Sequence, residues 1–343
     1  MKSYIYKSIT ILTLIILTSR ARAESIFPQS EWESPPLPHT IVSAASGDVN
    51  GDGQSDIVFS TSQGVFLTTA TTPADSKKII ESHGLEEFHR VHAGGFRHDG
   101  GADILVNGFI QNQAFSELWQ WHQGKWQSVQ RFPAIVMPRY WHGATVLFEQ
   151  KLRGRGAFAE DITALQWNGK KFVATPDHVP LNRGVGPANL NLFQVVGMGD
   201  KMALILPSGH IAVVDAQGKT LWRSGVKYGG SVDHLNYASK DPLGLQTESV
   251  LALMPRMMYD NITNRIYVIK NAGILSQTAQ YFVLSWTAGG LQEGFVSRRF
   301  DGTIVDLNTA DGLLLSLWAG KNFLSDVTAT PKSIMTKVAA PSF

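Results

Sequence analysis

The sequence predicts an all-β protein, and three observations support this. The chain of 343 residues contains 32 glycines and 15 prolines, a composition that suits short strands joined by tight turns. Brief segments rich in Val, Ile, Phe and Trp, bounded by Gly, Asp, Asn or Pro, recur along the chain. Helical spacing of apolar residues is scarce, with residues 76–83 as the one modest candidate. The long helices that a doubly wound α/β fold needs are missing.

A hairpin pattern recurs along the sequence from residue 118 onward. Two apolar or aromatic strands flank a short turn that contains Gly124, Gly169 or Gly218, and residues 284–291 repeat the pattern. The three glycines lie 45 and 49 residues apart. A period of about 40–50 residues with several hairpins per unit is typical of β-propellers, which stack four-stranded blades around an axis. We expect six or seven blades in a single domain over residues 24–343, with residues 24–45 leading into a strand of the last blade.

A second repeat is rich in Asp and Gly. The segment at 46–58, which reads SGDVNGDGQSDIV, is echoed at 94–105 by GGFRHDGGADIL. Aligning Asp52-Gly53 with Asp99-Gly100 gives an offset of 47 residues, which agrees with the hairpin period. Each copy leads directly into an apolar segment that reads as a strand.

The Asp-x-Asn-x-Asp-Gly-x-x-Asp loop at 48–56 resembles the FG-GAP/VCBS repeat of integrin-α-like propellers. Segments 221–224, 228–230, 270–271 and 283–286 are similar to exported bacterial FG-GAP repeat proteins, and segment 209–222 is similar to a quinoprotein-type blade. The resemblance implies a propeller with one repeat at 46–60 and a degenerate copy at 94–106.

The first loop carries oxygen donors at the spacing that a hard divalent cation needs. The expected ligands of one structural Ca²⁺ are the side chains of Asp48, Asn50, Asp52 and Asp56 and the backbone carbonyl of Gln54. An EF-hand is excluded, because its twelfth position would need a glutamate and is Phe59 here. The alternative is a metal-free turn whose carboxylates cap backbone amides.

The degenerate copy departs from this ligand pattern. Gly95 and Arg97 replace its first two ligands, which leaves Asp99 and Asp103 beside a cationic side chain. We therefore expect the second loop to keep the turn and to hold no metal.

The N-terminal residues read as a secretory signal peptide over residues 1–23. A basic start, an apolar run over residues 9–17, and small residues at Ala21 and Ala23 occur in the order of such signals. The apolar run is too short to cross a bilayer as a helix, and no later stretch is long enough. We therefore expect a chain that begins at Glu24, is exported to the periplasm, cell surface or medium, and has no transmembrane segment.

Composition excludes several classes of function. The chain has no cysteine, so it has no disulfide, thiolate metal site, cysteine nucleophile or lipidated cysteine. Removing the four basic residues of the signal from the total of 30 leaves 26, against 28 acidic residues, and nothing indicates a nucleic-acid footprint.

Familiar catalytic patterns are also absent. There is no Gly-x-Ser-x-Gly, His-Glu-x-x-His, phosphate-binding loop or Rossmann fingerprint. His89 and His92 could ligate a metal, but without a third ligand they read better as packed or surface residues. We therefore expect no enzyme activity.

Tyr140, Trp141 and His142 form the segment we expect at a ligand surface. The segment is aromatic, carries polar side chains, and is flanked by Pro138 and Gly143. The nine tryptophans of the chain could stack on sugars, but most are expected to pack between sheets.

The sequence thus favours an exported, calcium-stabilised propeller that binds or scaffolds a protein or glycan at the cell envelope. Two alternatives stay open: an enzyme of the quinoprotein or polysaccharide-lyase type, and an envelope assembly factor. The quinoprotein alternative lacks the vicinal cysteine pair that such enzymes often carry.

Overall fold

A computed structural model of the chain describes residues 30–339, apart from 70–71, 73–74, 98–100, 112, 153–157, 160, 181–190, 231–232, 241–245, 254–255, 274–276, 310–311 and 320–331. The expected signal peptide over residues 1–23 lies outside the described residues, and export stays a prediction. Nowhere in the described chain is there a helix with the length and apolar character needed to span a membrane.

The fold is an all-β propeller, as the sequence predicts. The described strands form four antiparallel sheets of four, one eight-stranded sheet and the two-stranded β18–β19 sheet. Dividing the eight-stranded sheet at its β22–β24 pairing gives six groups of four strands, which are called sheets 1 to 6 here in chain order. Sheet 1 comprises β2 (Ser43–Gly47), β3 (Asp56–Thr61), β4 (Gly64–Thr69) and β5 (Lys77–Glu81); sheet 2 comprises β6 (Glu86–Gly94), β7 (Asp103–Ile110), β8 (Gln113–His122) and β9 (Lys125–Phe132); sheet 3 comprises β10 (Ile135–Trp141), β11 (Ala144–Gln150), β12 (Asp161–Trp167) and β13 (Phe172–Pro180).

The second half of the chain repeats this arrangement with one insertion. The turn η1 (Leu192–Gln194) precedes sheet 4, and the hairpin of β18 (Asp233–Lys240) and β19 (Gln246–Leu253) separates sheets 4 and 5. Sheet 4 comprises β14 (Val195–Met198), β15 (Lys201–Ile205), β16 (His210–Asp215) and β17 (Thr220–Lys227); sheet 5 comprises β20 (Met258–Asp260), β21 (Arg265–Ala272), β22 (Thr278–Thr287) and β23 (Gly290–Val296); sheet 6 comprises β24 (Phe300–Asn308), β25 (Leu313–Ala319), β26 (Lys332–Val338) and β1 (Ser30–Glu33). Sheets 5 and 6 touch through a short β22–β24 pairing.

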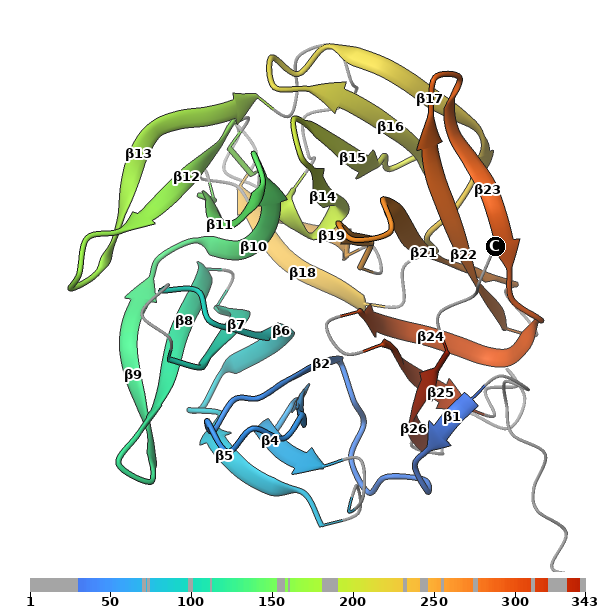
Figure 1. Cartoon of the computed structure of the whole chain (residues 1–343). Coiled ribbons are helices and arrows are strands. Elements are labelled where there is room, and N and C mark those ends of the chain that lie inside the picture. Colours follow the sequence, from blue (N-terminus) through green and yellow to red (C-terminus); the bar gives the residue numbers. More distant parts are fainter. Residues whose placement is uncertain are drawn as a thin grey trace, which may run out of the picture.

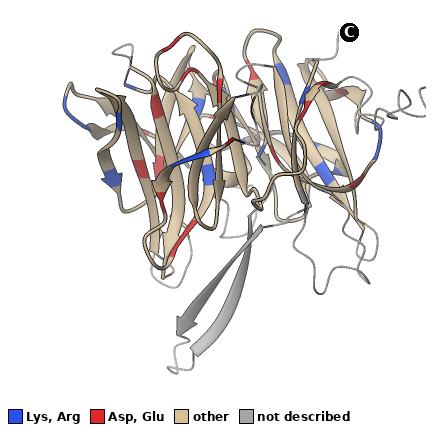
Figure 2. Ribbon diagram, turned by 90° about the horizontal axis from the view of Figure 1, so that it is seen from below, with Lys and Arg blue, Asp and Glu red and all other residues tan. Residues whose placement is uncertain are grey.

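The sheets follow one another around a central axis in chain order, and the last sheet lies beside the first (Figure 1). The N-terminal strand β1 pairs antiparallel with β26, so both ends of the described chain complete the same sheet. Seen from the edge, the basic and acidic segments of the ribbon are interspersed (Figure 2).

Buried apolar side chains form six clusters in the described chain. Five lie between two neighbouring sheets, and the largest includes residues of three sheets. Strand β3 shows how the sequence produces this pattern. Ile57 and Phe59 pack toward sheet 6, whereas Val58 between them packs toward sheet 2. Because successive side chains of a strand point to opposite faces, a strand covered on both faces reads as a continuous apolar run.

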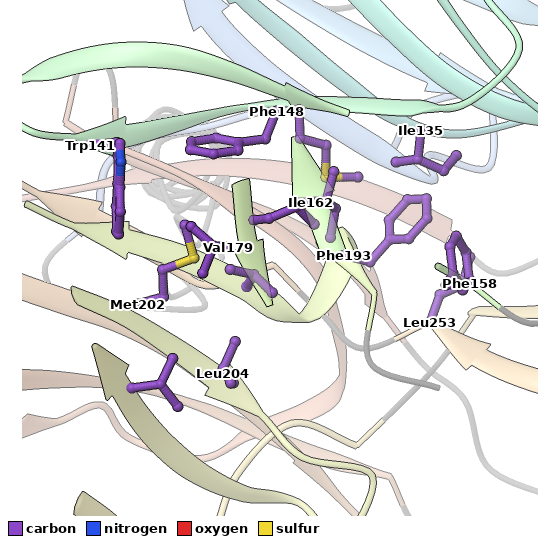
Figure 3. Close-up of a cluster of buried hydrophobic side chains, with 14 of the residues drawn as sticks. Ile135, Trp141, Phe148, Phe158, Ile162, Val179, Phe193, Met202, Leu204 and Leu253 are labelled. Carbon is purple, nitrogen blue, oxygen red and sulfur yellow. The ribbon is translucent and has the colours of Figure 1, made fainter. Parts of the chain in front are cut away.

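The largest of these clusters fills the space between sheets 3 and 4, with contributions from sheet 2 (Figure 3). Phe148 and Ile162 of sheet 3 face Met202 and Leu204 of sheet 4 in this cluster. A sheet of four strands could not bury such a face alone, so each sheet depends on its neighbours.

The repeated hairpins of the sequence occupy equivalent places. The turns with Gly124, Gly169 and Gly218 join the third and fourth strands of sheets 2, 3 and 4, and the 284–291 hairpin does the same in sheet 5. In the β8–β9 turn both Gln123 and Gly124 have positive φ, as a two-residue type I′ turn requires.

One local expectation is wrong. Residues 76–83 do not form a helix, because β5 runs through Lys77–Glu81 and pairs with β4. Pairing with the sheet overrides the weak helical spacing.

Candidate functional site

A cavity of about 360 Å³ lies where the inner strands of five sheets end. Most of its lining comes from β6, β10, β14, β20 and β24 or the residues that follow them, with Thr145 of β11 and Met257 before β20 in addition. Strands β6, β10, β14 and β24 lie around the axis in Figure 1. His92, Arg139 and Asn308 are its buried polar side chains. The volume falls within the range of about 300–1,000 Å³ usual for small-molecule sites.

Arg139 lies in the otherwise apolar strand β10 and is only 7% exposed. Its Nη1 donates to the carbonyl of Pro138 at 2.7 Å, and its Nη2 donates to the carbonyl of Leu192 in η1. Its Nε has no hydrogen-bond partner in the described part of the chain. Burial, and then the charges of Arg256 and Arg90, lower the pKa of Arg139 to about 9. Among the described residues no carboxylate forms an ion pair with Arg139, and the nearby Asp306 pairs with Arg256 instead.

The turn η1 is itself fixed by a capping box, which explains how Leu192 is placed. The Asn191 side chain accepts from the backbone of Phe193, and the Gln194 side chain accepts from the backbone of Asn191. Both polar side chains are buried, so these bonds are formed away from water.

Arg256 lies just before β20 and pairs with Asp306 of β24 at 3.0 Å. The same Nη2 donates to the Ser43 hydroxyl and to the carbonyl of Val91, both at 2.8 Å. Asp306 also accepts from the Ser43 hydroxyl at 2.5 Å and from the backbone of Ala44 at 3.1 Å. This network joins sheets 1, 2 and 6 to the segment before sheet 5 at the axis. Burial lowers the pKa of Arg256 to about 10, although Asp306 opposes that change.

His92 lies on β6 beside these arginines. Val91 and Ala93 face the cluster between sheets 1 and 2, which places Arg90 and His92 on the opposite face of the strand. Burial, followed by the charges of Arg256, Arg139 and Arg90, lowers the pKa of His92 well below its usual value. Its ring is therefore neutral at pH 7, and its Nε2 has no partner within the described chain.

The lowered pKa of His92 predicts a loss of stability in mild acid. Below pH 6.5 the unfolded chain binds a proton at His92 that the folded chain does not, so the free energy of unfolding falls as the pH falls. We expect a slope of up to about 1.4 kcal/mol per pH unit from this group. The slope between pH 6.5 and 5 is measured by urea unfolding of wild type and His92→Gln. The exposed His122 supplies the control variant His122→Gln. A wild-type slope that His92→Gln leaves unchanged would contradict the prediction.

The three residues of the predicted ligand segment lie in different surroundings in the structure. Tyr140 lines the cavity, and its ring lies 5.7 Å from that of Tyr259. Trp141 is buried in the cluster between sheets 3 and 4. His142 is exposed in the β10–β11 turn and, like Gly143, has positive φ. Alternation along the strand explains why adjacent residues separate.

The predicted calcium loop joins β2 to β3 on the face where the cavity lies. Asp48 accepts from the amides of Gly51 and Gly53 at 2.7 and 2.9 Å, and Asp52 accepts from the amide of Gln54 at 2.8 Å. The Asn50 side chain accepts from the amide of Asp52. In this arrangement the side chains cap the turn, as the metal-free alternative describes.

Asp56 ends the loop as the first residue of β3 and is buried. Burial raises its pKa, and the charges of Asp52 and Asp48 raise it further. This crowding of oxygen donors is chemically suited to Ca²⁺. However, no three His, Cys, Asp or Glu side chains in the described ranges are arranged to hold a metal ion. Calcium therefore stays a proposal, and the side chains would have to turn from the backbone amides toward the ion.

The described part of the degenerate copy shares one hydrogen bond with the first copy. Asp56 accepts from the amide of Val49, and Asp103 accepts from the amide of Phe96, in each case seven residues earlier. In the second copy Arg97 forms an ion pair with the buried Asp103 at 2.8 Å. Asp99 lies outside the described residues. A guanidinium thus stands beside the second carboxylate, whereas the first loop contains no cationic side chain.

The difference in cationic side chains between the two loops leads to a prediction about how calcium affects stability. If Ca²⁺ binds the loop, we expect it to raise the free energy of unfolding by about 2.7 kcal/mol at a hundredfold excess over Kd. Chelation should then lower the melting temperature, and Asp52→Ala in calcium should match the chelated wild type. Asp103→Asn should be less stable but should keep the calcium response. Melting curves that do not move with calcium or chelator would favour the capped turn.

Sequence reasoning did not identify the charged residues at the axis. Arg90, Arg139, Arg256 and Asp306 lie far apart in the chain and meet only because the sheets surround one axis. A usable signal was present: Asp306 and Arg139 each interrupt a strand whose other residues are mostly buried. An ionised side chain inside a buried strand requires a partner or a ligand.

No protein-family model and no curated protein matches this chain. Among solved structures, it is similar to a putative oxidoreductase (glucose dehydrogenase) from Thermus thermophilus at 12% identity, over 90% of this chain and 98% of that one, with a TM-score of 0.45. It is also similar to BamB from Moraxella catarrhalis at 13% identity, over 88% and 86% of the two chains, with a TM-score of 0.42. For the soluble aldose sugar dehydrogenase from Escherichia coli, the identity is 12%, the coverage 87% and 95%, and the TM-score 0.43.

These similarities concern the fold alone, and they do not show that the chain belongs to the FG-GAP/VCBS family. They correct one expectation. We expected no enzyme activity because familiar motifs are absent, but similar propellers include two dehydrogenases. The absence of those motifs therefore does not exclude catalysis on this fold.

Proposed function

We propose that the protein binds an anionic small molecule in its axial cavity. The observation that carries the proposal is the buried guanidinium of Arg139, which forms no ion pair with a described carboxylate. A buried ion is costly unless it is paired, so a site of this kind gains free energy when an anion enters.

Three polar side chains converge where the anion would be held. Arg139 offers an Nε–H without a described acceptor, and the neutral His92 has an unpartnered Nε2. Asn308 lines the same cavity from β24, and its Oδ1 accepts from Ser46 at 3.3 Å, which orients its amide nitrogen. The anion would thus contact β6, β10 and β24.

The competing carboxylate of Asp306 is already engaged by Arg256, Ser43 and the backbone of Ala44. Arg256 and Arg90 add positive charge near Arg139, as their influence on its pKa shows. Both effects favour an external anion over an internal counterion.

The test compares Arg139→Met with wild type. Calorimetric titration with inorganic phosphate should show that the variant binds about 10- to 100-fold more weakly, as loss of a charge-assisted hydrogen bond predicts. Without ligand, Arg139→Met should be at least as stable as wild type, because it removes a buried charge that no described carboxylate pairs with. Arg223→Met, at an exposed site on β17, is the matched control and should change neither quantity. The proposal fails if neither phosphate nor acetate binds wild type, or if Arg139→Met binds equally well.

We also propose that the protein is exported and that the 48–56 loop binds one calcium ion. A protein or glycan at the cell envelope would be its partner. A protein partner is supported by Leu221 and Val226 on β17 and Val296 on β23, which are exposed apolar side chains on two strands in contact. Such side chains on neighbouring strands are typical of interaction surfaces.

A further inference from the structure

The lining residues are buried at the inner end of the cavity, its floor, and more exposed at its open end, its mouth. The residues at its floor are buried, and they include His92, Arg139 and Asn308. The residues at its mouth are half-buried or exposed, and Ile262 is 90% exposed. The polar and cationic groups therefore lie deep, and a ligand must place its charge at the inner end.

The wall above this floor is largely aromatic and apolar. The rings of Tyr140 and Tyr259 lie 5.7 Å apart with an interplanar angle of 39°. Met257 and Met258 line the cavity beside them. The Tyr259 hydroxyl donates to the Asn264 side chain at 3.1 Å, which fixes the ring from its outer end. A rigid pair of rings with thioether neighbours suits a flat, apolar group.

The carboxylate of Asp260 also helps to direct the anionic group of a ligand to the floor of the cavity. Asp260 lines the cavity on the mouth side and accepts from the amide of Ile262 at 2.9 Å and from the Thr263 hydroxyl at 2.6 Å. Its negative charge disfavours an anionic group at the mouth and so reinforces binding of the anion at the floor.

We propose that the ligand is an organic anion with one anionic head and an apolar ring, the head at the floor and the ring against Tyr140 and Tyr259. This inference rests on the proposed function and goes beyond it by naming the ligand class. Simple inorganic anions would fill only the inner part of the cavity.

The experiment uses three probes that share one head group: phenyl phosphate, glucose 6-phosphate and inorganic phosphate. Calorimetric titration of the full chain should show phenyl phosphate binding about tenfold tighter than inorganic phosphate, as stacking on a tyrosine pair predicts. Tyr259→Ala should remove this advantage, so that phenyl phosphate binds no tighter than inorganic phosphate. Tyr259→Leu keeps apolar bulk and replaces Tyr259→Ala in the same test if the alanine variant does not fold. Trp121→Ala, an exposed aromatic position on β8, is the matched control and should keep the advantage.

The outcomes separate the two proposals. Equal affinity for phenyl phosphate and inorganic phosphate would overturn the ring proposal and leave the anion site intact. Tighter binding of glucose 6-phosphate than of phenyl phosphate would overturn the apolar ring in favour of a sugar. If none of the three phosphate probes binds, the ring proposal is wrong, and if acetate does not bind either, the proposed function is wrong as well.

Discussion

Asp306→Ala should lower the free energy of unfolding by about 3–5 kcal/mol, the usual loss when one partner of a buried ion pair is removed. Asp306 is fully buried, and its removal leaves Arg256 uncompensated beside Arg90. It also removes the acceptor of the Ser43 hydroxyl and of the Ala44 amide, which connect β24 to β2. Urea unfolding measures the change.

The matched control is Asp200→Ala. Asp200 pairs with Lys201 at 2.5 Å, but its side chain is 70% exposed. Exposed pairs contribute about 0–1 kcal/mol, so the control should change stability little. The double variant Arg256→Met/Asp306→Leu should recover much of the loss, because it removes both charges together. Equal losses in Asp306→Ala and Asp200→Ala would show that the axial network does not stabilise the fold.

Phe148→Ala should cost about 3–5 kcal/mol, the range measured for truncating a buried aromatic residue. Phe148 is fully buried between sheets 3 and 4 and packs edge-to-face with Trp141 at 6.0 Å (Figure 3). Val226→Ala, on the exposed part of β17, should stay within about 0.5 kcal/mol of wild type. Chemical denaturation of the two variants checks the difference. A loss under about 1 kcal/mol for Phe148→Ala would mean that this interface repacks or is not a tight core.

The fold was predictable because its local signals repeat. Turn glycines such as Gly124 and Gly169 mark the same hairpin in successive sheets, and positive φ at these positions explains the residue type. The Asp-rich repeat was also informative, since Asp56 and Asp103 each begin the second strand of a sheet and accept from an amide seven residues earlier. Signals of this kind depend on a few neighbouring residues.

Only one residue of the candidate site was predicted from the sequence. Tyr140 was expected at a ligand surface and lines the cavity, whereas Trp141 beside it belongs to the core. The pKa values of Arg139 and His92 are lowered because packing around the axis buries both side chains and brings together charged residues that are far apart in sequence. Sequence periodicity predicts successive sheets in chain order but leaves their number open between six and seven, and it does not show which charges face one another.

The pairing of β1 with β26 has a consequence for how the protein is made. Trp32 and Ser34 bond to Thr336 and Met335, about 300 positions later in the chain, with separations of 304 and 301 residues. A chain synthesised from its N-terminus can therefore form sheets 1 to 5 progressively, but β1 has no partner until the last strand emerges. Because such distant contacts form late, we expect completion of the ring to be the slow, final step of folding. An interrupted chain that stops before Lys332 would leave β1 unpaired and the cluster between sheets 6 and 1 incomplete. We therefore expect any chain that lacks β26 to leave the ring of sheets open between sheets 6 and 1.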